Sequence, residues 1–183
     1  TSDKLRQRAQ MIVDQVDRMV HIIEHVRMFA REAGKPEVAV MQVNDVVNSS
    51  MDMLGTQLRS HGIELALDLA EGLLSVLGNA YSLEEVILNL LTNAVKYNRE
   101  GGQIHLSVAH DENTGRARIS VQDSGVGISP QSLLHIGEKF YRVPNSEGYA
   151  SGTGLGLAIA FRIVETHGSE MEIESELDVG STF

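Results

Sequence analysis

Amide and lysine side chains repeat along one predicted helix near the middle of the chain. Within residues 83–97, apolar side chains recur at intervals of three and four, as a helix with one buried face requires. A polar row follows another face at intervals of four, four and three: Glu85, Asn89, Asn93 and Lys96. Asparagine is a poor helix former, because its amide competes for nearby backbone groups. The row is therefore either functional or a solvated face with incidental amides.

Two glycine-containing segments follow this helix. The first is Asp123-Ser124-Gly125-Val126-Gly127-Ile128, in which Asp123 ends a predicted strand and the glycines allow a tight backbone turn. The second is Gly152-Thr153-Gly154-Leu155-Gly156-Leu157, which opens a helix predicted to run to about Thr166. A glycine-rich loop at a helix N-terminus presents backbone N–H groups and the positive end of the helix dipole, as phosphate sites do. Alone this pattern is weak, because such glycines often serve only packing or turns.

The segment between them has little periodicity. Residues 131–151 carry several glycines and a proline, and they include Phe140-Tyr141-Arg142. A long irregular stretch inside a compact domain is typical of a functional lid or of partial disorder. Just ahead of this irregular stretch, Ser129-Pro130 resembles the N-cap and first turn of a short helix.

Strands and helices predicted around these motifs position them. Residues 38–43 favour a strand, Asn44 is placed to cap a helix that ends near His61, and residues 63–69 alternate as a half-buried strand. The central helix is capped by Asn79 or by a box that begins at Ser82. Residues 104–108 and 117–121 predict a hairpin, and further strands are predicted at 171–175 and 180–183.

The first 34 residues have a different pattern. Apolar residues alternate steps of four and three without a break: Leu5, Ala9, Ile12, Val16, Met19, Ile23, Val26 and Ala30. This seam favours a helical bundle, and the partner helix comes most simply from a second copy of the chain. His21 and His25 are four residues apart, but no third ligand completes a zinc site, so solvated helix histidines are favoured.

Composition limits the classes of function. The chain has 183 residues, a net charge of -10 and no cysteine. A general nucleic-acid binder needs a basic face, so the charge argues against that class, and disulfides and thiolate metal sites are excluded. The sequence contains no run of about 18 apolar residues, so no membrane span is predicted. Because the first residue is Thr1, we expect a piece of a longer protein.

Taken in order, the four motifs resemble the catalytic and ATP-binding domain of sensor histidine kinases, a branch of the superfamily that includes DNA gyrase, the heat-shock chaperone ATPase and MutL. Residues 89–97 resemble the N box, 123–127 the first glycine box, 140–142 the F box and 152–157 the second glycine box. The resemblance covers about residues 38–183. It implies an α+β Bergerat fold: a two-layer α/β sandwich whose mixed, mostly antiparallel sheet is covered on one face by helices.

The implied domains are a dimerisation helix at 1–34 and a catalytic ATP-binding domain at 35–183, with an ATP lid at about 129–152. Asp123 is implied to accept a hydrogen bond from the adenine amino group. Gly125 and Gly127 are implied to let the backbone approach the base, and Tyr97 to pack near the base or ribose. The wider nucleotide-binding set comprises Asn89, Asn93, Lys96, Ile128, Phe140, Tyr141, Arg142, Gly152, Thr153, Gly154, Leu155, Gly156, Leu157 and Thr182.

The resemblance also implies the chemistry of the phosphate end. Asn89 and Asn93 are implied to bind Mg²⁺ through amide oxygens, and which amide contacts the ion stays open. Lys96 is implied to neutralise phosphate charge, and Arg142 to stabilise the moving phosphoryl group. In the gyrase branch a glutamate that activates water stands at the position of Asn89. An amide cannot take that proton, so phosphoryl transfer is favoured over hydrolysis.

One family motif is missing. In the H box an acidic residue follows the phosphoacceptor histidine, whereas here Ile22 follows His21 and Val26 follows His25. We therefore expect a fragment that binds ATP without phosphorylating itself. The implied partners are a second copy, through the N-terminal helix, and the receiver domain of a response regulator, with no nucleic acid and no direct membrane contact of this fragment. The implied location is the cytoplasm, either as a soluble protein or as the cytosolic part of a membrane-bound sensor. Alternatives are an anti-sigma-type serine kinase of the same superfamily and a nucleotide-binding interaction module.

Overall fold

The computed structural model describes residues 38–60, 62–72, 75–112, 114–144 and 152–183. The helix predicted over residues 1–34, with its two histidines and its dimerisation face, lies outside the described residues. Part of the predicted lid, residues 145–151, also lies outside them.

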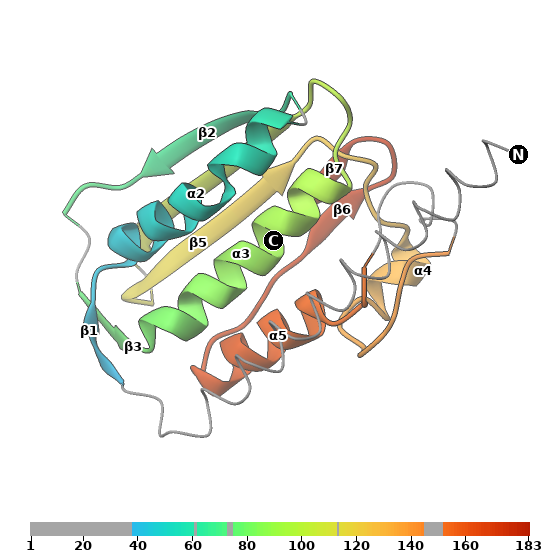
Figure 1. The fold of residues 1–183 in the computed structure, drawn as a ribbon. Helices are drawn as coiled ribbons and strands as arrows, with labels where there is room; N and C mark the ends of the chain where they lie inside the picture. Colours follow the sequence, from blue (N-terminus) through green and yellow to red (C-terminus); the bar gives the residue numbers. More distant parts are fainter. Residues whose placement is uncertain (1–37, 61, 73–74, 113, 145–151) are drawn as a thin grey trace, which may run out of the picture.

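A five-stranded sheet forms one layer of the fold (Figure 1). Its order is β2-β4-β5-β7-β6, and β2 and β4 are parallel whereas the other neighbouring pairs are antiparallel. The strands are β2 (Glu64–Leu69), β4 (Gln103–Asp111), β5 (Arg116–Asp123), β6 (Glu174–Glu176) and β7 (Gly180–Thr182). The predicted mixed, mostly antiparallel sheet is confirmed.

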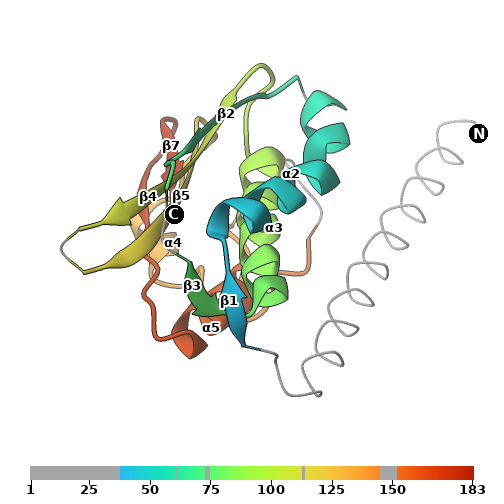
Figure 2. The same cartoon turned by 90° about the vertical axis from the view of Figure 1, so that its left-hand side faces the viewer.

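Helices form the second layer and cover one face of this sheet (Figures 1 and 2). The long ones are α2 (Val43–Ser60), α3 (Ala80–Lys96) and α5 (Gly156–Thr166), and α3 packs against both of the others. A short helix, α4 (Pro130–Leu133), lies in the connection between β5 and α5. This arrangement confirms the two-layer α/β sandwich.

The core lies between α3 and the sheet. The apolar stripe of α3 is buried, and Ile87 and Leu91 are both 0% exposed. Facing residues come from alternate positions of β4, where Ile104 and Leu106 are at most 1% exposed. Each such side chain contributes about 1.5–3 kcal/mol when it is fully buried. Packing of the stripe thus fixes the orientation of the helix that carries the polar row.

Two predicted helix starts are settled by hydrogen bonds. The side chain of Asn79 accepts from the backbone N–H of Ser82 at 2.9 Å, so Asn79 is the N-cap of α3. Ser129 caps α4 in the same way, and Pro130 follows it as predicted. Asn44 does not cap α2, because the helix begins at Val43 and the Asn44 amide donates instead to the carbonyl of Ala70 at 3.0 Å.

The strand predictions differ from the structure at two places. A small antiparallel pair, β1 (Ala39–Met41) with β3 (Val76–Gly78), includes a strand that the sequence did not indicate. Three residues are too short a run to show alternation. The strand predicted over 171–175 is present only as β6, because pairing with β7 begins at Glu174.

Candidate functional site

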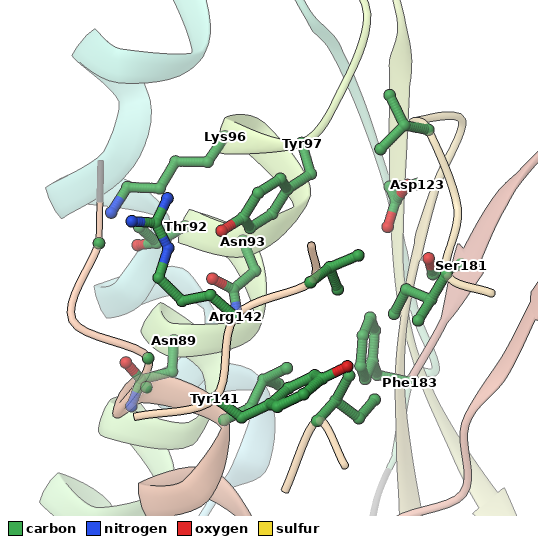
Figure 3. A pocket seen from close by; sticks show the side chains of 18 of the residues that line it. Asn89, Thr92, Asn93, Lys96, Tyr97, Asp123, Tyr141, Arg142, Ser181 and Phe183 are labelled. Carbon is green, nitrogen blue, oxygen red and sulfur yellow. The ribbon is translucent and has the colours of Figure 1, made fainter. Parts of the chain in front are cut away.

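A cavity of about 380 Å³ lies between α3, the ends of β5 and β7, and the segments that flank α4 and lead into α5. Its wall contains most of the predicted site residues: Asn89, Asn93, Lys96, Tyr97, Asp123, Gly127, Ile128, Tyr141, Arg142, Gly152, Thr153, Gly154, Gly156 and Leu157. Four predicted residues do not line it: Gly125, Phe140, Leu155 and Thr182. Side chains from distant parts of the sequence point into the same space (Figure 3).

Polar side chains of α3 form one wall. Asn89, Asn93 and Lys96 line the cavity as the predicted row requires, whereas Glu85 is buried outside it. Thr92, which was not among the predicted site residues, also lines the cavity. Its position three residues after Asn89, on the same helix face, is the sequence signal that could have predicted it. The amide nitrogen of Asn89 is buried and has no hydrogen-bond partner among the described residues. A buried orphan donor at a cavity wall fits a site that a polar ligand completes.

Two cations lie on the side of the cavity away from Asp123 (Figure 3). Burial lowers the pKa of Lys96 below its usual range, and the positive charge of Arg142 lowers it further. In a chain of net charge -10, these two cations create a local positive field. This side of the cavity suits an anion.

A buried carboxylate marks the opposite side. Asp123 is 9% exposed and stands at the end of β5. Burial raises its pKa, while hydrogen bonds from the backbone N–H groups of Gly125 and Ser181 oppose the rise. The Gly125 bond to Oδ1 measures 2.8 Å. An ionised carboxylate only accepts hydrogen bonds, so this side suits a ligand that donates them.

Ser181 lines the cavity beside Asp123, whereas the predicted Thr182 does not. The reason is register: Ser181 pairs with Asp123 across β5 and β7, while Thr182 pairs with Gln122. Neighbouring residues of a strand face opposite sides of the sheet, so only one of the two can share the cavity with Asp123. A three-residue strand gave no sequence signal for which one it is.

The glycines of the first motif serve packing within the chain. A Cβ on Gly125 would clash with the carbonyl oxygen of Tyr97, and a Cβ on Gly127 with that of Glu176. Gly127 also has φ 67°, which disfavours other residues. Close backbone packing therefore disfavours a side chain at both positions, and of the two glycines Gly127 lines the cavity.

The second motif forms the approach to α5. The helix itself begins at Gly156, four residues later than the start of the predicted loop, and no side chain caps its N-terminus. A Cβ on Gly156 would lie 2.9 Å from Oδ1 of Asn89, whereas nothing lies within 4 Å of one on Gly152. The backbone thus approaches the polar row closely at one end of the loop and leaves open space at the other. An uncapped N-terminus at a cavity wall favours an anionic ligand.

The aromatic-arginine cluster divides between the cavity and the surface. Tyr141 and Arg142 line the cavity, but Phe140 is 70% exposed and has φ 66°. The backbone N–H of Phe140 donates to the carbonyl of Gly154 at 2.8 Å. This bond joins the described part of the predicted lid, residues 129–144, to the second glycine motif.

Apolar residues that sequence reasoning missed complete the wall. They come from α2, α3, the β5–α4 connection, the lid and the C-terminal end: Met53, Leu54, Leu88, Val126, Ile136, Val143 and Phe183. Each looks like an ordinary core residue in the sequence, so no local signal marks it. The mixture of apolar wall and few polar groups is typical of a small-molecule site.

The described residues contain no cluster of acidic and imidazole side chains that could hold a metal by itself. Among residues 38–183, leaving out the undescribed positions, no group of three or more His, Cys, Asp or Glu side chains could hold an ion. The oxygens of Asn89 and Asn93 are the kind of hard ligand that Mg²⁺ accepts, and two amides are too few to hold it alone. They fit an ion that arrives with its own phosphate ligands.

None of the described helices is long and apolar enough to cross a membrane.

Comparison with known proteins gives a family match. Residues 78–183 match the family model described as histidine kinase-, DNA gyrase B-, and HSP90-like ATPase. The chain is 34% identical to histidine protein kinase DivJ of Caulobacter vibrioides, and the alignment covers 99% of this chain and 30% of that relative. It is 38% identical to sensor histidine kinase RppB of Synechocystis, and that alignment covers 77% of this chain and 31% of that relative. The chain thus spans about a third of each.

Solved structures agree with this match. Full-length ShkA in complex with AMPPNP has a TM-score of 0.75 and 27% identity, and the alignment covers 90% of this chain and 34% of that one. The mycobacterial sensor histidine kinase MprB has a TM-score of 0.65 and 26% identity, with coverage of 80% and 93%.

Proposed function

This chain belongs to the histidine kinase-, DNA gyrase B-, and HSP90-like ATPase family, and from that membership we propose that it is the ATP-binding catalytic part of a two-component sensor histidine kinase. The names of the relatives DivJ and RppB support the kinase branch. In that role the chain transfers the γ-phosphoryl group of ATP to a histidine, from which an aspartate of a response regulator receives it.

The two-ended polarity of the cavity carries this proposal. A buried carboxylate, Asp123, accepts hydrogen bonds at one end, and Lys96 and Arg142 provide positive charge at the other. The uncapped N-terminus of α5 lies at the wall as well. A nucleotide with an amino-bearing base and an anionic phosphate chain has the complementary polarity.

Mg²⁺ belongs to the proposal. Asn89 and Asn93 would hold it through amide oxygens together with the phosphates. When bound, the ion would neutralise phosphate charge during transfer. The buried amide nitrogen of Asn89, which has no partner among the described residues, would donate a hydrogen bond to a phosphate oxygen of the same ligand.

The polar residues supply positioning and charge, without a base for water. An amide at Asn89 cannot take a proton from water, so hydrolysis lacks its usual catalyst there. Lys96 and Arg142 orient the phosphate chain and stabilise the negative charge of the transferred group. Tyr141 and the apolar wall exclude water from the reacting end.

The remaining parts of the kinase assembly are proposals from the sequence. Residues 1–34 form a dimerisation helix and residues 35–183 the catalytic domain, with a lid at about 129–152. The phosphoacceptor histidine lies outside this chain, because neither His21 nor His25 has an acidic residue after it. The proposed kinase works in the cytoplasm, with a response-regulator receiver domain as its second partner.

Calorimetric titration with ADP and with a non-hydrolysable ATP analogue, each with and without Mg²⁺, tests the nucleotide site. Asp123→Asn removes the carboxylate, and we expect affinity to fall by at least about tenfold, as for a lost hydrogen bond to a charged group. Asn93→Ala should reduce the effect of Mg²⁺ on affinity. Asp68→Asn and Asn48→Ala, at exposed positions away from the cavity, are the matched controls.

No measurable affinity of the unaltered chain for either nucleotide would overturn the proposal. Phosphorylation assays on a longer chain that includes its native upstream helix then test the kinase step. A phosphohistidine on residues 1–183 alone after incubation with Mg-ATP would contradict the placement of the acceptor outside this chain.

A further inference from the structure

Ser175 of β6 joins its strand to β7, which carries Ser181 at the carboxylate side of the cavity. It stands directly opposite Ser181 in the β6–β7 register. Its hydroxyl oxygen accepts from the backbone N–H of Ile128 at 2.8 Å and donates to the carbonyl of Gly180 at 2.9 Å. A third contact, at 3.0 Å, joins it to the hydroxyl of Ser181. Ser175 itself does not line the cavity.

The first two contacts determine the direction of the third. A serine hydroxyl has one hydrogen to donate and two lone pairs that accept. The carbonyl of Gly180 can only accept, so it takes the single hydrogen of Ser175. Only a lone pair then remains for the serine pair, and Ser181 must be the donor in it.

This direction sets what Ser181 offers to a ligand. Its hydroxyl hydrogen is used on Ser175, and its backbone N–H is used on Asp123. Toward the cavity it has lone pairs alone. Ser181 is 6% exposed and stands beside Asp123, so two hydrogen-bond acceptors lie next to each other at this end (Figure 3).

We propose that Ser175 is a positioning residue that fixes Ser181 as a hydrogen-bond acceptor, so that Ser181 and Asp123 together select a purine with an amino group at position 6. The proposal rests on the nucleotide site proposed above. An exocyclic amino group has two hydrogens, one for each acceptor, whereas a 6-oxo group would place a third acceptor against them. Unpaired or opposed buried polar groups are a strong source of discrimination between ligands.

Dissociation constants for ADP and for IDP, which carries the 6-oxo group, test this through their ratio. In Ser175→Ala the hydroxyl of Ser181 is free to turn and to donate to the oxo group. We expect the ratio of the IDP constant to the ADP constant to fall by about 3- to 10-fold, the worth of one hydrogen bond. Ser175→Thr keeps the hydroxyl and should keep the ratio. Ser107→Ala, half-buried on β4 and outside the cavity, is the matched control.

A role for Ser175 in packing alone predicts a different result. Both nucleotides would then weaken equally and the ratio would not move, which would overturn the proposal. In a Ser181→Ala background the additional Ser175→Ala change should leave the ratio as it is, because the two residues act through one contact.

Ser181→Ala alone tests the direction if Ser175→Ala does not fold. Loss of an acceptor weakens ADP and relieves IDP, so the ratio should fall. If Ser181 instead donates to the base, its loss penalises IDP and the ratio rises, contrary to the proposal. Binding of ADP by the unaltered chain separates these outcomes from failure of the nucleotide site, since no binding at all refutes the site rather than the role of Ser175.

Discussion

Individual residues at the cavity are held in states that cost stability. Lys96 is charged in a partly buried position beside Arg142, and its pKa is lowered by burial and by that neighbour. Because the pKa of Lys96 is lower in the folded state, its cost to folding is full below the folded pKa and decreases as the pH rises from that value to the ordinary lysine pKa. Such local costs are typical of sites that a ligand of opposite charge completes.

Asp123 makes nucleotide affinity depend on pH. Burial raises its pKa above the ordinary aspartate value. The ionised carboxylate only accepts hydrogen bonds, whereas the protonated carboxyl is neutral and carries an O–H donor. As the pH falls through this raised pKa, the carboxyl becomes protonated and we expect ADP affinity to drop by up to about tenfold per pH unit. The acid limit should therefore lie at higher pH than for an ordinary aspartate.

The sign for folding is opposite. In the window between the ordinary and the raised pKa, the folded state binds more protons than the unfolded state, so the contribution of Asp123 to the free energy of unfolding increases as the pH falls.

Calorimetric titration with ADP across the acid range checks the predicted pH dependence of the affinity. In Asp123→Asn nothing titrates at this position, so the acid decrease in ADP affinity should be absent. An identical pH profile in this variant would refute Asp123 as the group that titrates.

At the scale of elements, α3 serves the core and the site with opposite faces. Its apolar stripe is buried against the sheet while Asn89, Asn93 and Lys96 line the cavity. The two ends of neighbouring helices are also joined: Nδ1 of His167, at the end of α5, donates to the carbonyl of Ile163 at 2.8 Å, and Nε2 accepts from the backbone N–H of Asn79 at 3.4 Å. The start of α3 is therefore fixed from two sides.

Loss of the Asn79 cap should weaken this arrangement. In Asn79→Ala the N–H of Ser82 loses its acceptor, and we expect the free energy of unfolding to fall by about 1 kcal/mol. Denaturant unfolding measures the change. Ser49→Ala, which removes an exposed hydrogen bond to Glu84, is the control and should change stability by less than about 0.5 kcal/mol. Equal effects of the two changes would contradict a specific role of the cap.

At the scale of the whole molecule, the cavity joins parts that are distant in the sequence. Its wall combines α3, the ends of β5 and β7, the lid and the start of α5. A ligand that contacts all of them binds the folded chain and not the unfolded one. Such a ligand stabilises the fold by mass action.

Mg-ADP should therefore raise the stability of the whole domain. At a free concentration of one hundred times its dissociation constant, we expect about 2.7 kcal/mol of additional unfolding free energy. Thermal or denaturant unfolding with and without the nucleotide measures it. Asp123→Asn, at the same nucleotide concentration, should show a much smaller increase, and an equal increase in both proteins places the nucleotide elsewhere.

Local patterns were sufficient to predict much of the fold and of the site. The three-and-four spacing of α3, the alternation in β2 and β4, and the cap residues Asn79 and Ser129 each act within a few neighbouring residues. The order of the four motifs along the chain indicates one family.

What depends on register and on close packing needed the tertiary structure. Pairing of Asp123 with Ser181, and not with Thr182, decides which hydroxyl reaches the cavity. The clash of a Cβ on Gly125 with the carbonyl of Tyr97 explains that glycine by a neighbour 28 residues away in sequence. Such contacts join residues that are distant along the chain. The sequence by itself therefore determined which chemistry is present, and the packing of strands and helices decided which atoms meet to perform it.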